Sequence, residues 1–134
     1  MLKGKNGVLS VDVLGPFGEG GADEQGLGFG WQKDWQGSTY AFTIAYDGTC
    51  KFLEARDGWF EREIGKIENF NPGKRFHTVM VVVRNGEAIG YVENQFCAIY
   101  NMPNYQSGYV GVVTSMWQGQ GKAFFDEYRI YELP

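Results

Sequence analysis

Short β-type segments separated by turn dipeptides run through most of this 134-residue chain. Asp47-Gly48, Asp57-Gly58 and Asn85-Gly86 each lie between runs rich in aromatic and β-branched residues. Asp-Gly and Asn-Gly favour two-residue hairpin turns, because those turns need φ > 0. Turn signals at this spacing, with no stretch of convincing helical period, predict an all-β fold of about nine or ten antiparallel strands in two packed sheets.

The clearest alternation of large and small side chains runs from Thr39 to Tyr46. In a strand, successive side chains point to opposite faces, so each set shares a face. We expect the large set to face the core. It consists of Tyr40, Phe42, Ile44 and Tyr46, and the small set of Thr39, Ala41, Thr43 and Ala45. The chain is long enough for one such core and shows no linker, so we expect a single β-sandwich domain over residues 1–134.

Charge and hydropathy exclude several classes of protein. The net charge is −4, and no segment concentrates Lys or Arg, which argues against a nucleic-acid partner. No apolar run approaches the roughly 20 residues that cross a bilayer, so we expect no membrane span and a soluble protein. Residues 1–7 lack the apolar stretch of a secretory signal, which leaves the location of the protein open.

The two cysteines, Cys50 and Cys97, have no CxxC spacing. Two cysteines are too few for a disulfide scaffold. They fit one disulfide, and they fit equally well as two separate small apolar strand positions. The sequence leaves both alternatives open.

Four segments carry a family resemblance. In order they are YAFTIAYDGTCKFLEA, FNPGKRFHTVMVVVRNGEAIGYVENQFCAIY, SGYVGVVTS and AFFDEYRIYEL. They resemble the concanavalin A-like jelly roll of lectins and glucanases, and are most similar to laminin-G-like and bacterial 3-keto-disaccharide hydrolase-like domains. The resemblance covers roughly residues 25–134 and implies an antiparallel two-sheet jelly-roll sandwich in an extracellular protein. It is specific for fold and not for function, because this architecture carries binding, hydrolysis and adhesion alike.

The family usually opens with extra strands that have no counterpart in this sequence. A shortened N-terminal side predicts an unpaired sheet edge, and an exposed edge is a surface that a second chain can cover. We therefore expect a homo-oligomer formed through an exposed sheet edge. A structural or assembly subunit without a sugar ligand is one alternative function.

Aromatic residues near turns, beside short polar side chains, favour a carbohydrate-binding or adhesion module with a glycan as partner. A pyranose offers an apolar face for stacking and hydroxyls for hydrogen bonds. The opposing interpretation is that the indoles only cap the core. The predicted sugar-binding residues are Trp31, Trp35, Trp59, Trp117, Tyr105, Asp34, Arg56, Asn94 and Asn104.

Carboxylates support a second alternative, a glycoside hydrolase or lyase. Such enzymes need two carboxyl groups at a defined separation. Alternation puts Glu61 and Glu63 on one face of a strand, with Glu54 on its neighbour. A solvated strand face also explains these residues.

Metal and histidine chemistry have little support in the sequence. Relatives of this fold bind calcium at a rim, so calcium is open as a cofactor. Its candidates, Asp23, Glu24, Asp34 and Asp47, are also ordinary loop carboxylates, and the sequence assigns no site. The single histidine, His77, lies in the most apolar strand and is expected to be packed rather than catalytic.

Overall fold

The computed structural model describes residues 6–15, 17, 23–32, 38–103, 105–115 and 123–133. Ten strands form, and none of these ranges holds a helix that could cross a membrane. The strands are β1 (Gly7–Gly15), β2 (Glu24–Trp31), β3 (Thr39–Ala45), β4 (Thr49–Ala55), β5 (Trp59–Lys66), β6 (His77–Arg84), β7 (Glu87–Val92), β8 (Gln95–Asn101), β9 (Tyr109–Ser115) and β10 (Phe124–Glu132). The all-β prediction is confirmed.

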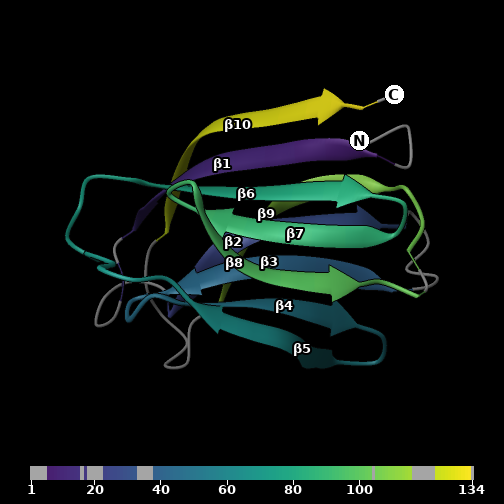
Figure 1. Cartoon of the computed structure of the whole chain (residues 1–134), viewed down its shortest axis with the longest axis horizontal. Helices are drawn as coiled ribbons and strands as arrows, with labels where there is room; N and C mark the ends of the chain where they lie inside the picture. The colour runs from purple at the N-terminus through teal and green to yellow at the C-terminus, as the bar shows by residue number, and fades with distance from the viewer. Residues whose placement is uncertain are drawn as a thin grey trace.

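The strands form two stacked five-stranded antiparallel sheets. One sheet has the order β10-β1-β6-β7-β8 and the other β5-β4-β3-β2-β9, and Figure 1 shows the two layers one behind the other. The first strand, β1, pairs with β10 on one side and β6 on the other, so it is not an edge. The sheet edges are instead β10, β8, β5 and β9. Oligomerisation through an edge stays a prediction.

Hairpins form at all three predicted places, but only Asn85-Gly86 is a two-residue turn. Three residues connect β3 to β4 (46–48) and β4 to β5 (56–58). At Asn85-Gly86 both residues have positive φ, 52° and 77°, as a type I′ turn requires. Glu93 and Asn94 also take positive φ in the turn between β7 and β8. The hairpins explain why β6, β7 and β8 are sequential neighbours in one sheet.

The core lies between the sheets and follows the predicted alternation. Tyr40, Phe42 and Ile44 are fully buried, and the rings of Phe42 and Phe52 have centroids 4.7 Å apart. The expectation for Tyr46 is wrong, since β3 ends at Ala45 and Tyr46 is exposed in the turn. Alternation holds only as far as the strand extends.

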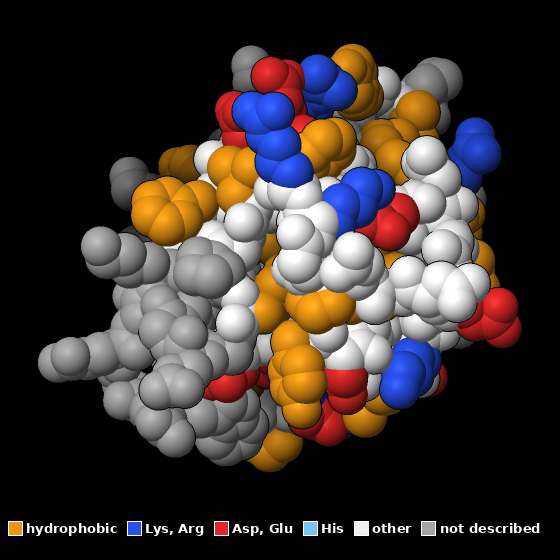
Figure 2. All heavy atoms as spheres, turned by 90° about the vertical axis from the view of Figure 1, so that its left-hand side faces the viewer, with side chains coloured by type: hydrophobic (Ala, Val, Ile, Leu, Met, Phe, Trp, Pro, Cys, Tyr) orange, Lys and Arg blue, Asp and Glu red, His pale blue; other side chains and the backbone are white. Residues whose placement is uncertain are grey.

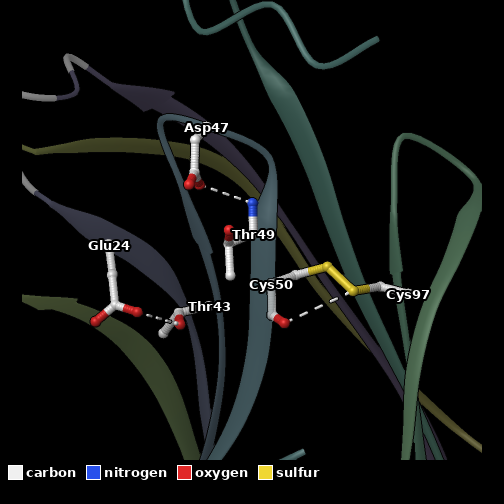
Figure 3. The surroundings of a disulfide bond; sticks show 6 residues. All are labelled: Glu24, Thr43, Asp47, Thr49, Cys50 and Cys97. Atoms are coloured by element: carbon white, nitrogen blue, oxygen red, sulfur yellow. Dashed lines mark hydrogen bonds between the residues drawn. A yellow bond between two sulfur atoms is a disulfide. The ribbon is translucent and has the colours of Figure 1, made fainter. Parts of the chain in front are cut away.

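Cys50 and Cys97 form a disulfide, which resolves the open alternative (Figure 3). Cys50 lies on β4 and Cys97 on β8, so the bond joins the two sheets through the core. Their Cα atoms are 6.5 Å apart, within the usual range for a disulfide.

His77 begins β6 and is buried, as expected for a packed histidine. Its Nδ1 lies 2.5 Å from Glu93 Oε1, and its ring contacts Phe70 with centroids 4.4 Å apart. This pair belongs to the end of the sandwich that carries the connection from β5 to β6. Figure 2 shows that end, where hydrophobic side chains lie scattered among charged ones.

Candidate functional site

The outward face of the sheet β5-β4-β3-β2-β9 is hollowed because its central side chains are small. Across neighbouring strands, Leu53 lies opposite Ala41, Ala41 opposite Gly28, and Gly28 opposite Gly111. The next row places Ala55 opposite Thr39. Along each strand these positions alternate with residues that point into the core, so they themselves face outward. We call the hollowed surface the groove; its floor is formed by Gly28, Thr39, Ala41, Leu53, Ala55 and Gly111.

Two indoles line one hollow of the groove. Trp59 begins β5, Trp31 ends β2, and their side chains are 53% and 39% exposed. β4 and β3 lie between these strands, so β5 and β2 are roughly 14 Å apart across the sheet. The hollow has a volume of about 560 Å³, a size typical of small-molecule sites.

A β-bulge turns Trp31 toward this hollow. Gly28 pairs with Gly111 and Trp31 with Tyr109, so β2 has one more residue than β9 over this stretch. Gly30 lies in the extra step with φ 71°, a conformation that glycine adopts without strain. Simple alternation would put Trp31 on the core side with Phe29; the bulge reverses its face.

The turn between β4 and β5 adds charged groups beside Trp59. Arg56 and Asp57 are exposed and line the same hollow. The backbone N–H of Arg56 donates to the carbonyl of Gly58 at 3.0 Å, which closes the turn. The hollow thus combines two indoles, a guanidinium, a carboxylate and a small-residue floor.

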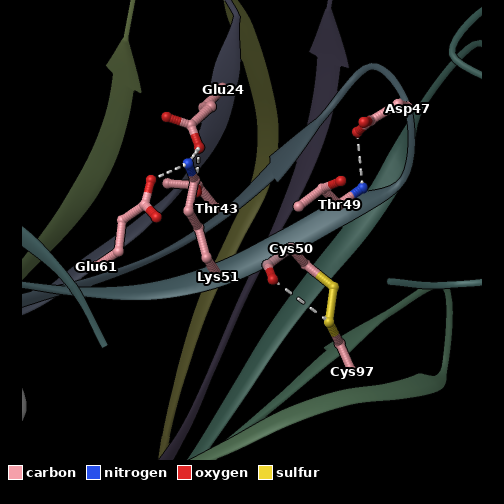
Figure 4. A network of polar contacts seen from close by, with 8 residues as sticks. All are labelled: Glu24, Thr43, Asp47, Thr49, Cys50, Lys51, Glu61 and Cys97. Carbon is pink, nitrogen blue, oxygen red and sulfur yellow. Dashed lines mark hydrogen bonds and ion pairs between the residues drawn. A yellow bond between two sulfur atoms is a disulfide. The ribbon is translucent and has the colours of Figure 1, made fainter. Parts of the chain in front are cut away.

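Lys51 lies at the other end of the groove, between two carboxylates (Figure 4). Its Nζ is 2.7 Å from Glu24 Oε1 and 2.7 Å from Glu61 Oε1. Burial alone would lower the pKa of Lys51, but the hydrogen bonds and charges of the two carboxylates outweigh it and raise the pKa. Lys51 is therefore a fixed positive charge on the surface of the sheet.

Asp47 adds a carboxylate to this end. Its Oδ1 accepts a hydrogen bond from the Thr49 backbone N–H at 2.9 Å, which lowers the pKa of Asp47 and keeps it ionised (Figures 3 and 4). A hollow of about 370 Å³ lies there, lined by Asp23, Glu24, Ala45, Tyr46, Asp47, Thr49 and Lys51.

A middle hollow of about 280 Å³ lies between the two ends. It shares Trp59 and Val113 with the indole end and Glu24 with the Lys51 end. The three hollows therefore follow one another along the same sheet face.

The paired-carboxylate prediction is wrong in its geometry. Glu61 lies opposite Leu53, but a bulge in β5 then places Glu63 opposite Phe52. Phe52 is buried in the core, whereas Leu53 lines the groove. Glu61 and Glu63 therefore belong to opposite faces, because one extra residue reverses the alternation.

Glu54 faces away from the groove, into the sandwich. Its carboxylate accepts hydrogen bonds from Ser38 Oγ at 2.5 Å and Tyr100 Oη at 2.7 Å, with Arg62 Nε 3.5 Å away. Burial raises the pKa of Glu54, but these partners and Arg56 outweigh it and leave the pKa lowered. Burial, with the hydrogen bond to Glu54, raises the pKa of Tyr100. Glu54 holds the ends of β3 and β4 together beside the hollow.

Three of the predicted sugar-binding residues, Trp31, Arg56 and Trp59, meet in one hollow. Tyr105 packs against the rings of Phe29 and Tyr40 at the core instead. Asn94 lies in the β7–β8 turn of the other sheet. The remaining four lie outside the described residues: Asp34, Trp35, Asn104 and Trp117.

Sequence reasoning missed the small floor residues and the role of Lys51. The sequence does indicate part of the floor, because Thr39 and Ala41 belong to the small set of the alternation in β3. It gives no indication of the ion pairs of Lys51, because the partners Glu24 and Glu61 come from β2 and β5. Among the described residues, no three His, Cys, Asp or Glu side chains gather as a metal would need, and calcium stays a prediction.

Solved structures share this architecture. The carbohydrate-binding module CBM66 from Bacillus subtilis matches with a TM-score of 0.78 at 15% identity, over 96% of this chain and 76% of that chain. Sheep galectin-11 matches with a TM-score of 0.67 at 14% identity, over 97% and 92% of the two chains. The Bacillus licheniformis β-glucanase matches with a TM-score of 0.64 at 12% identity, over 98% and 68%.

No protein-family model matches the sequence, and no curated protein sequence matches it either. Identities this low establish the fold alone. The chain has the concanavalin A-like jelly-roll sandwich fold that its sequence resembles, which lectin-like and catalytic proteins share.

Proposed function

We propose that this protein is a non-catalytic carbohydrate-binding module that holds a glycan in the groove. The observation that carries the proposal is the pair of partly exposed indoles, Trp31 and Trp59, that line one hollow with a small-residue floor. An exposed indole offers an apolar surface on which the CH face of a sugar ring stacks. Arg56 and Asp57 at the same hollow supply a donor and an acceptor for hydroxyls.

The structural neighbours support the same class of ligand. Two are named as a carbohydrate-binding module and a galectin, and a sialidase module, CBM40 from Ruminococcus gnavus, is a third. One matching structure is that module bound to α2,6-sialyllactose. Because stacking and a few water-exposed hydrogen bonds leave little free energy after association costs, we expect micromolar or weaker affinity.

The hydrolase alternative loses the pair of carboxylates on which it was based. Glu61 and Glu63 lie on opposite faces, and Glu54 is held inside the sandwich by Ser38 and Tyr100. Glu61 in turn pairs with Lys51. A reducing-sugar assay on mixed polysaccharides provides the check: release of sugar that Glu61→Gln abolishes would contradict a binding-only function.

An extracellular or other oxidising location is part of the proposal. The disulfide between Cys50 and Cys97 supports it, because structural disulfides persist mainly in oxidising compartments. Secretion of the natural protein, followed by thiol labelling of the secreted form, would test the location.

Two neighbouring aromatic residues provide a matched test of binding. Trp59 and Phe60 are 53% and 49% exposed, but Trp59 lies opposite Ala55 and Phe60 opposite the inward-facing Glu54. A glycan array followed by titration calorimetry should find a ligand whose affinity falls at least ten-fold in Trp59→Ala. Phe60→Ala should bind as the wild type does. No binding by the wild type to any glycan, or equal loss in both variants, would contradict the proposal.

A further inference from the structure

This inference rests on the proposed function and concerns the class of glycan. The groove extends well beyond the indole hollow. Along β4 it runs from Ala55, beside Trp59, to Thr49, beside Asp47. A strand rises about 3.3 Å per residue, so these six steps span roughly 20 Å. The groove is therefore several times longer than a single sugar ring.

The middle hollow lies between the two ends and borders both. Trp59 and Val113 line both the indole hollow and the middle one, and Glu24 lines both the middle hollow and the Lys51 end. Ala41, Thr43 and Leu53 form the floor of the middle hollow, and none of them has a side chain large enough to fill it. A ligand stacked at Trp59 can therefore continue along the sheet.

The chemistry changes along the groove from aromatic to polar. At the far end, Lys51 Nζ lies 2.7 Å from Oε1 of Glu24 and 2.7 Å from Oε1 of Glu61, so one cation joins two carboxylates. Carboxylate oxygens accept hydrogen bonds from hydroxyl groups. The three side chains present fixed hydrogen-bonding groups, because the ion pairs restrain their positions (Figure 4).

The charge at this end selects among glycans. Among the described residues that line the far hollow, three are carboxylates, Asp23, Glu24 and Asp47, and one is a cation, Lys51. Lys66, opposite Thr49, adds a positive charge beside Asp47, and Glu61 adds a fourth carboxylate beside Lys51. The excess of carboxylates repels an anionic sugar, since like charges disfavour each other over a few ångströms. A uronic acid or sialic acid unit would be disfavoured there, whereas neutral hydroxyls would not.

We infer that the groove binds an extended, uncharged oligosaccharide, with one unit stacked at Trp59 and a following unit hydrogen-bonded by the network of Glu24, Lys51 and Glu61. The ligand is thus a stretch of a neutral glycan rather than a single sugar.

Titration calorimetry with oligosaccharides of increasing length tests this inference. The probes are neutral gluco-, manno-, galacto- and fructo-oligosaccharides of one to six units, with oligogalacturonides as the anionic series. For the neutral series that binds, affinity should rise at least ten-fold between one and four units. Oligogalacturonides of equal length should bind at least ten-fold more weakly.

Variants at the far end separate the two parts of the groove. Lys51→Met should lower affinity for the four-unit probe at least three-fold and leave one-unit binding unchanged, whereas Lys51→Arg should restore most of it. Ala45→Leu fills the far hollow without changing charge and should act as Lys51→Met does. Lys74→Met is the matched control, because Lys74 also lies near a carboxylate, Glu93 at 3.5 Å, but outside the groove.

The outcomes distinguish this inference from the proposed function. Binding that does not change with length, or a far-end variant of unchanged melting temperature that binds four units normally, overturns the extended-ligand inference alone. Tighter binding of the anionic series overturns the charge argument. Failure of the wild type to bind any probe overturns both.

Discussion

Cys50 and Cys97 are 47 residues apart in the sequence and join β4 of one sheet to β8 of the other. Cys50 directly precedes Lys51, so the bond fixes the strand that carries the polar end of the groove (Figures 3 and 4). The bond closes a long loop, and long loops lose the most conformational entropy when they are cross-linked.

Removal of this disulfide should therefore destabilise the protein strongly. For a loop of this length the chain-entropy relation gives about 4 kcal/mol. The double variant Cys50→Ala with Cys97→Ala should show that loss in urea denaturation, and a Tm lower by roughly 10–15 °C. Reductant should lower the Tm of the wild type and leave that of the variant unchanged. A loss below about 1 kcal/mol would contradict a structural role.

A side chain at Gly111 should block the groove without a cost in stability. A Cβ added at Gly111 meets no atom within 4 Å, and the residue lines the indole hollow. We expect Gly111→Val to keep or slightly raise the Tm, because glycine in a strand interior is destabilising by roughly 0.5–1 kcal/mol. Glycan binding should fall at least ten-fold.

Gly90 is the contrasting control for that experiment. A Cβ there would lie 2.4 Å from the ring of Phe42 in the core. Gly90→Ala should therefore destabilise the fold by about 1–3 kcal/mol through overpacking. Thermal unfolding of both variants decides the point, and equal losses at Gly111 and Gly90 would be inconsistent with an open groove.

Glu54 should make stability depend on pH in the acid range. Its pKa is lowered in the folded state, so its contribution is present above the unfolded value near 4.5 and is lost as pH falls through the folded value. Glu54→Gln should cost about 1.5–3 kcal/mol at pH 7, because hydrogen bonds to a buried charge are lost. The difference from the wild type should shrink toward pH 3.

Urea denaturation at several pH values measures that difference. Glu63→Gln is the control, since Glu63 is exposed in the same pair of strands. If the difference in unfolding free energy between the wild type and Glu54→Gln did not change with pH, the loss would come from altered packing and not from the charge of Glu54.

The amino-acid sequence by itself determined the strands and turns of this protein. Alternation buried Tyr40, Phe42 and Ile44, and Asn85-Gly86 closed a hairpin as its φ requirement predicts. These features depend on neighbours within a few residues, so local chemistry suffices to predict them. The exposed indoles Trp31 and Trp59 were also predicted as binding residues from their places beside turns.

The tertiary structure alone decided which of these residues share a site. The bulges at Gly30 and in β5 reverse the facing of Trp31 and separate Glu61 from Glu63, and alternation cannot reveal an extra residue in one strand. The pairing of Cys50 with Cys97, and of Lys51 with Glu24 and Glu61, joins strands distant in the sequence. Such contacts depend on strand order and register, which are set by the packing of the whole core.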